Sequence, residues 1–259
     1  MNNFKATLVD IQVMIWRSTM HILRNTDQLL GAFFQPIMFL VLFASVFGGS
    51  IEKALPEGIS YINYLMAGIV VQTVAFGSTT TAIAVSNDMS KGIMDRFRSL
   101  PMSNIAVLSG HVVADLLRNA ISTTVMIVAG FAIGFRPETD LVGWLQIALL
   151  LIIFTLAFSW LASIVGVISK SVEAVQWLTF VIIFPLTFAS SAFTPTAGMG
   201  RYLRAFAENQ PITQVVEAVR ALILGQDPGD YYTKAIIWCL VCLVVAVPIS
   251  ARLFRRRTS

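Results

Sequence analysis

Six long apolar stretches constrain this 259-residue chain more than any other feature. An α-helix needs about 20 mostly apolar residues to cross a hydrocarbon core, because every backbone amide must be hydrogen-bonded within the segment. Charged residues make up 12% of the chain, against about 25% in soluble domains, so a water-facing surface cannot be covered. The pattern predicts an all-α membrane protein with six transmembrane helices, at residues 29–49, 61–85, 119–135, 141–169, 174–194 and 235–254.

The lysines and arginines predict the orientation, since basic loops tend to stay in the cytoplasm. With the N-terminus inside, 12 of the 18 basic residues are cytoplasmic: Lys5, Arg17, Arg24, Lys91, Arg96, Arg98, Arg118, Lys170, Arg252, Arg255, Arg256 and Arg257. The outer set is Lys53, Arg136, Arg201, Arg204, Arg220 and Lys234. We therefore expect a multi-pass protein of the plasma membrane, in contact with lipid, with both termini cytoplasmic. The C-terminal arginines then fit a topology anchor better than a nucleic-acid site.

Residues 1–28 are expected to form an amphipathic helix at the membrane interface, ahead of a six-helix transmembrane domain at 29–259. At about 100° per residue, Arg17, His21 and Arg24 share a polar face, opposite Phe4 and Leu8. Such a helix lies flat at the lipid boundary. A soluble helix packed on a partner is the alternative.

The longest outer loop, residues 195–233, is expected to hold short external helices. RYLRAFAEN and PITQVVEAVRALILG are both amphipathic, and the second begins with Pro211 and stops at Gly225. Glu217 and Arg220 make the second segment too polar to span the membrane.

Catalytic and metal-binding constellations are not visible in the sequence. The two histidines, His21 and His111, are expected at membrane edges, so no imidazole cluster is predicted. Cys239 and Cys242 lie in the middle of an apolar span and are interpreted as packing residues. We expect no catalytic residue, no metal and no cofactor on this chain.

The chain also shows no energy source of its own. The pairs Asp115–Arg118, Lys170–Glu173 and Glu217–Arg220 are spaced three apart and are expected near span ends as neutralised interface residues rather than as an ion path. No G-x-x-x-x-G-K-[ST] sequence is present to cradle ATP phosphates. A partner must supply the work for any uphill transport.

The loop at residues 86–104 is the most informative segment. Ile93, Met94, Phe97 and Leu100 can form an apolar ridge flanked by charges, and Pro101 ends the turn. A short protruding helix of this kind suits a groove in another protein. An ordinary basic loop resting on lipid headgroups is the equally weighted alternative.

Three segments resemble the permease subunits of ABC type-2 exporters, in particular the drug-export branch that includes the daunorubicin-resistance permeases. These segments are KGIMDRFRSLPMS at 91–103, GHVVADLLRN at 110–119, and FPLTFASSAFTPTAGMGRYLRAFAENQPITQVVEAVRALILG at 184–225. The order of elements along nearly the whole chain resembles the same family.

The resemblance implies a second permease subunit, identical or homologous, and two cytoplasmic ABC ATPase subunits that carry ATP and Mg. It implies that the loop after the second span is a coupling helix, next to the N-terminal helix. Carried over, the ATPase-coupling residues are Lys91, Gly92, Asp95, Arg96, Phe97, Arg98, Leu100 and Pro101, with Arg17, His21 and Arg24.

The resemblance also implies a substrate pathway along the first, second and fifth spans. Aromatic rings with scattered hydroxyls and amides can hold an amphipathic molecule without a charge partner. Each of these residues has an alternative role in helix packing or lipid contact. The expected pathway residues are Phe33, Phe34, Phe39, Phe43, Gln72, Thr73, Phe76, Thr79, Thr80, Gln176, Thr179, Phe180, Thr187 and Ser190.

Taken together, the sequence predicts the permease subunit of an ATP-driven exporter of hydrophobic or amphipathic compounds, with drug or antibiotic efflux first. Export of a lipid, glycolipid or polysaccharide is the closest alternative. A membrane scaffold that transports nothing and an intramembrane enzyme are the remaining classes.

Overall fold

The computed structural model describes residues 12, 16, 19–20, 26–56, 58–90 and 104–258, and within them every regular element is helical. The expected N-terminal interfacial helix lies almost wholly outside the described residues, and the coupling loop lies there from 91 to 103. The elements are α2 (Thr26–Ile51), η1 (Glu52–Ala54), α3 (Tyr61–Gly77), α4 (Thr79–Ser90), α6 (Asn104–Ile133), α7 (Leu141–Ile168), α8 (Val172–Phe188), η2 (Thr196–Gly198), α9 (Arg201–Asn209), α10 (Pro211–Ile223) and α11 (Gly229–Thr258).

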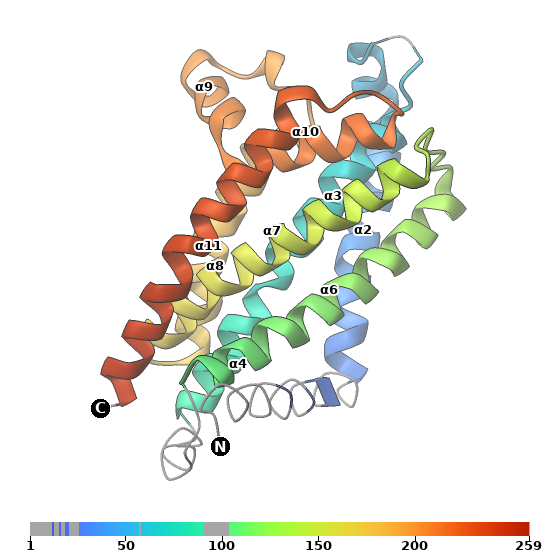
Figure 1. Ribbon diagram of the computed structural model, residues 1–259. Helices are drawn as coiled ribbons and strands as arrows, with labels where there is room; N and C mark the ends of the chain where they lie inside the picture. Colours follow the sequence, from blue (N-terminus) through green and yellow to red (C-terminus); the bar gives the residue numbers. More distant parts are fainter. Residues whose placement is uncertain are drawn as a thin grey trace.

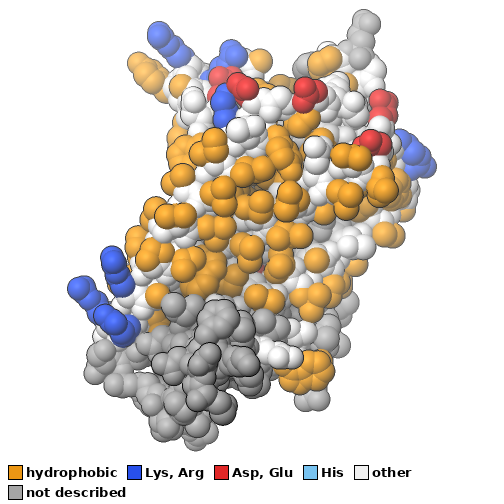
Figure 2. Space-filling model, in the orientation of Figure 1, with side chains coloured by type: hydrophobic (Ala, Val, Ile, Leu, Met, Phe, Trp, Pro, Cys, Tyr) orange, Lys and Arg blue, Asp and Glu red, His pale blue; other side chains and the backbone are white. Residues whose placement is uncertain are grey.

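Five of the described helical segments are long and apolar enough to cross a membrane: Phe33–Ile51, Tyr61–Ser90, Leu108–Ile133, Leu141–Ile168 and Gly229–Arg257. The apolar helix α8 is shorter, at 17 residues. These helices run side by side, with α9 and α10 at one end of the bundle and the C-terminus at the other (Figure 1). We call these the α10 end and the C-terminal end. Between them the visible surface is mostly hydrophobic, and the Lys, Arg, Asp and Glu side chains gather towards the two ends (Figure 2).

Helix α3 lies at the centre of the bundle. It contacts α2, α6, α7, α8 and α10, and nearly all of its side chains are buried. At Gly68 the backbone of α3 meets the backbone of Ala192, in the segment after α8, so closely that no Cβ would fit. Along the outside of the core, α11 packs against α7 over most of its length (Figure 1).

The second predicted span is broken into α3 and α4 at Ser78. The Ser78 amide still donates to Val74 at 3.2 Å, but the Thr81 amide turns to the Ser78 carbonyl at 3.0 Å. The Gly77 carbonyl instead accepts from the Arg118 side chain and from the Thr80 hydroxyl, the latter at 3.0 Å. A side chain from α6 therefore takes part in the break.

Other boundaries also differ from the sequence-based expectation, and α11 begins at Gly229 rather than at 235. Helix α6 begins at Asn104 rather than at 119, because its polar residues are buried against neighbouring helices and do not end the span. Helix α8 ends at Phe188 rather than at 194, and the residues that follow fold under α10. The all-helical class is confirmed.

The α10 end is closed by tight turns and by α10 itself. Pro211 is the first residue of α10, as its position predicts, and Gly225 follows the helix with a φ of 65°. Helix α10 is buried on most sides, against α3, α7 and α11. It covers the core rather than lying free on the surface.

Candidate functional site

Two adjacent cavities lie in the bundle and share one wall. The α6 cavity, between α2, α3 and α6, has a volume of about 330 Å³. The α8 cavity, between α2, α3, α4 and α8, has a volume of about 250 Å³. Gln35, Phe39 and Phe76 line both, so two aromatic rings and one amide stand between the two spaces.

Most of the expected pathway residues lie around these cavities. Phe39, Gln72, Thr73, Phe76 and Thr80 line the α6 cavity. The lining of the α8 cavity adds Thr79, Gln176, Thr179 and Phe180. Residues from four separate helices, α2, α3, α4 and α8, are thereby brought together.

The other expected pathway residues lie elsewhere. Phe34 is 71% exposed on the outer face of α2, and Phe33 is half-buried beside it. Thr187 and Ser190 are buried, but their hydroxyls donate to carbonyls of their own helix end, at Ile183 and Thr187. Both hydroxyls are thus occupied by the backbone.

A run of phenylalanine rings continues from the α8 cavity towards the α10 end. The rings of Phe184 and Phe188 stack at 4.2 Å, and Phe188 stacks on Phe193 at 4.8 Å. Phe193 in turn stacks on Phe43 at 4.6 Å, which gives this expected pathway residue a packing role. These rings separate the cavities from the α10 end with apolar surface.

The α6 cavity includes residues that the sequence reasoning did not select. Asn119 and Ser122 of α6 line it, together with Arg118. Asn119 and Ser122 were missed because the family resemblance pointed to other spans. The signal was available: His111, Asp115, Arg118 and Ser122 recur at helical spacing, which marks one polar face.

The predicted position of Asp115 and Arg118 near a span end is wrong. Both belong to the apolar segment Leu108–Ile133, and they are only 2% and 4% exposed. The Arg118 guanidinium pairs with the Asp115 carboxylate, which also accepts from the Ser159 hydroxyl of α7. A buried pair of this kind must be closely matched, because each charge alone would be strongly disfavoured.

A second pair of ionisable groups lies nearer the C-terminal end. Nε2 of His111 lies 3.0 Å from a carboxylate oxygen of Asp88, and both residues are buried. His111 is therefore held against α4, close to the ends of the apolar segments Leu108–Ile133 and Tyr61–Ser90. Among the described residues, no three His, Cys, Asp or Glu side chains are grouped to hold a metal.

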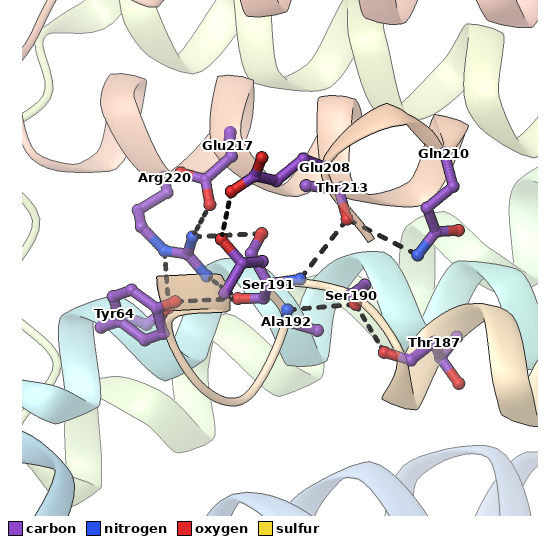
Figure 3. Close-up of polar contacts among 11 residues, drawn as sticks. Tyr64, Thr187, Ser190, Ser191, Ala192, Glu208, Gln210, Thr213, Glu217 and Arg220 are labelled. Atoms are coloured by element: carbon purple, nitrogen blue, oxygen red, sulfur yellow. Dashed lines mark hydrogen bonds and ion pairs between the residues drawn. The ribbon is translucent and has the colours of Figure 1, made fainter. Parts of the chain in front are cut away.

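At the α10 end a buried polar network fastens α10 to α3 and to the segment after α8 (Figure 3). Arg220 of α10 lies over the ring of Tyr64, 3.5 Å from its centroid, and donates to the Tyr64 carbonyl at 3.3 Å. It also donates to the Ser191 carbonyl at 2.6 Å and to Glu217 at 2.5 Å. The Gln210 amide adds bonds of 2.6 and 3.0 Å to the carbonyls of Leu186 and Ala189. We call these residues the α10 network.

The expected ATPase-coupling residues cannot be placed in this arrangement. All of them, on the N-terminal segment and in the loop between α4 and α6, lie outside the described residues. Both flanking helices, α4 and α6, are described, and they also line the α8 and α6 cavities respectively.

Long apolar helices that form cavities lined by aromatic rings, amides, hydroxyls and one paired arginine define a multi-pass membrane protein. A sequence model of the ABC-2 type transporter family matches residues 9–224, so the chain belongs to this family of transporter permeases.

Individual permeases are similar to this chain over most of their length. The chain is 28% identical to the daunorubicin resistance ABC transporter permease protein DrrB1 of Streptomyces coeruleorubidus, over 98% of this chain and 89% of that protein. It is 24% identical to the probable doxorubicin resistance ABC transporter permease protein DrrC of Mycobacterium tuberculosis, over 88% and 82% of the two chains. A putative transport permease, ycf38 of Porphyra purpurea, is 22% identical over 88% and 78%.

Proposed function

We propose that this chain is the membrane permease of an ATP-driven exporter of hydrophobic or amphipathic compounds, with drug or antibiotic efflux as its activity. Membership of the ABC-2 family supports the mode of action, and the names of the relatives support the cargo class. The observation that carries the proposal is the gathering of the expected pathway residues around two adjacent cavities.

In this proposal the chain crosses the membrane six times, with α8 and the residues after it as the fifth crossing, and both termini are cytoplasmic. It pairs with a second permease, identical or homologous. Two cytoplasmic ABC ATPase subunits bind ATP and Mg and perform the hydrolysis. The permease itself contributes no catalytic residue.

The cargo would lie between α2, α3 and α8. Phe39 and Phe76 present rings to both cavities, while Gln176 and Thr179 present polar groups to the α8 cavity. Rings give a flat apolar body contact area, and neutral amides and hydroxyls orient it without requiring one charge. This composition suits a range of planar or lipid-like molecules.

Replacing a shared ring tests the pathway. Phe76→Ala should raise the KM for ATP-dependent uptake of doxorubicin into inverted vesicles by about tenfold, since a buried ring contributes about 1.5–3 kcal/mol. Trp177→Ala is the control, because Trp177 is 68% exposed on α8 and lines neither cavity. Equal effects of the two substitutions would contradict the assignment.

The coupling loop is tested by reversing its charge. Arg96→Glu with Arg98→Glu should abolish co-purification of the ATPase and ATP-dependent efflux, if this loop and the N-terminal helix form the docking site. The matched control is Arg201→Glu with Arg204→Glu, which reverses two charges on α9 at the other end of the bundle. Unchanged co-purification in the first variant would remove this part of the proposal.

A further inference from the structure

Three polar atoms around the α6 cavity have no hydrogen-bond partner among the described residues. They are Nε2 of Gln72, Nδ2 of Asn119 and Oγ of Ser122. The three residues are only 4%, 2% and 3% exposed, and each lines the cavity. Buried polar groups are nearly always paired, so three unpaired groups around one space call for an explanation.

The two threonine hydroxyls and the arginine of the lining are already occupied. The Thr73 hydroxyl donates to the Ile69 carbonyl at 2.7 Å, and the Thr80 hydroxyl donates to the Gly77 carbonyl at 3.0 Å. Arg118 is paired with Asp115 and donates to Gly77. Asp115 therefore balances the Arg118 charge, and the buried groups of the lining left without a partner are two amide nitrogens and one hydroxyl.

The backbone of α3 helps to fix one of these groups. Gly77 has no Cβ, and a Cβ there would collide with Oδ1 of Asn119. The Asn119 amide thus lies directly against α3, beside the Phe76 ring that separates the two cavities. Asn119 and Ser122 are three apart on α6 and share the face that lines the cavity.

From these groups we infer that the α6 cavity is a binding subsite for the oxygen acceptors of an uncharged aromatic molecule, such as a diaryl ketone. Gln72, Asn119 and Ser122 would supply donors for its carbonyl oxygen, which accepts two hydrogen bonds at a time, and Phe39 and Phe76 would contact its rings. The amides and the hydroxyl are specificity-determining residues, because a ligand without an acceptor would leave all three unpaired. The inference rests on the proposed function only in treating this molecule as cargo.

The test uses benzophenone as the probe, because its photoactivated carbonyl inserts into nearby C–H bonds and so reports where the acceptor lies. The full-length permease in membrane vesicles is irradiated with benzophenone, and the saturable labelling is mapped by mass spectrometry. We expect labelled peptides from α3 and α6 around Gln72 and Asn119. Diphenylmethane, which lacks the carbonyl, should need about three- to tenfold more compound per lost hydrogen bond to compete.

Variants separate hydrogen bonding from shape. Asn119→Leu and Gln72→Met keep similar volume and should weaken saturable labelling about three- to tenfold each, with Ser122→Ala as the smallest change. Thr124→Val is the control, since Thr124 is exposed on α6 and its hydroxyl donates within the helix, to Ala120. Equal competition by diphenylmethane, or labelling unaltered in all three variants, would overturn the inference.

Failure of the subsite can be told apart from failure of the proposed function. Labelling requires neither the ATPase nor ATP, whereas uptake into inverted vesicles requires both. Saturable labelling without uptake of any compound would contradict the proposed exporter function but not the subsite. Uptake of doxorubicin with no labelling in α3 and α6 would contradict the subsite but not the proposed exporter function.

Discussion

The α10 network and the wall of the α6 cavity are built from similar parts but use them differently. Each contains a buried arginine three residues from its acidic partner on the same helix, Arg220 with Glu217 and Arg118 with Asp115. In the α10 network the guanidinium also reaches two backbone carbonyls and a ring. Around the α6 cavity, amide nitrogens remain unpaired.

The unpaired atoms differ in kind as well as in place. In the α10 region the described atoms without a partner are amide oxygens, those of Gln210 and Gln214, and both amide nitrogens donate to carbonyls. At the α6 cavity the unpaired atoms include donors of residues that line a space of about 330 Å³. The first region is built to hold helices together, and the second retains groups that a bound molecule can use.

The largest effect is expected from breaking the α10 network. Arg220→Met leaves the Glu217 carboxylate without its partner and removes one of the two hydrogen bonds to the Ser191 carbonyl, the other coming from the Tyr64 hydroxyl. It should lower the free energy of unfolding by about 3–5 kcal/mol. The stability of the purified permease in detergent, followed by thermal unfolding, checks this. Arg204→Met removes an exposed ion pair on α9 and should change stability by less than about 1 kcal/mol.

A smaller loss is expected where backbone meets backbone. Gly68→Ala introduces a Cβ that collides with the Ala192 carbonyl and should cost about 1–3 kcal/mol, because neither backbone can move aside freely. Gly49→Ala is the control, since nothing lies within 4 Å of a Cβ at that position in α2. If the two variants unfold at the same temperature, the result contradicts the close backbone contact between Gly68 and Ala192.

At the α6 cavity, by contrast, a new Cβ should disturb binding more than folding. Gly77→Ala collides with the Asn119 side chain, which can rotate away at lower cost than a backbone can. Saturable benzophenone labelling should fall about threefold or more, as one hydrogen bond is lost, while the unfolding temperature stays closer to wild type than in Gly68→Ala. If Gly77→Ala lowers the unfolding temperature and leaves labelling unchanged, the α6 cavity serves stability rather than binding, which contradicts this contrast.

The smallest effect is a pH dependence of α9. The hydrogen bond from Arg204 holds the pKa of Glu208 below its usual value, and the Thr196 hydroxyl adds to this. Because the folded-state pKa is lowered, the stabilisation is present above the unfolded-state pKa of about 4.3 and is lost as pH falls through the folded-state value. The hydrogen-exchange protection factors of residues 201–209, which correct for the pH dependence of intrinsic amide exchange, should fall on acidification, and Glu208→Gln should remove that change.

The apolar spans could be predicted from sequence because hydrophobicity over about 20 residues is a local property. The all-helical class and the approximate positions of α2, α7 and α11 follow from it. Local hydropathy failed at α6, where Asp115 and Arg118 indicated a span end although both lie inside the apolar segment Leu108–Ile133, buried against other helices. A polar residue ends a span only when nothing in the bundle can pair with it.

The candidate site could be predicted from the sequence only in part. The resemblance pointed to three spans, and the structure adds the α6 wall with Asn119 and Ser122. Glu217 and Arg220 could be recognised as a helical pair, but the bond from Arg220 to Tyr64 joins residues 156 apart in sequence. The break at Ser78 also could not be predicted from the sequence, because the Arg118 side chain of another helix takes part in it.

The central claim is that this permease is moved by ATP hydrolysed on a separate subunit. The most direct measurement is doxorubicin accumulation in proteoliposomes containing the purified chain, with and without its P-loop ATPase. We predict accumulation only when the ATPase and Mg-ATP are both present, and none when the ATPase carries a substituted P-loop lysine. Accumulation driven by the chain alone, or ATP turnover by it, would contradict the account.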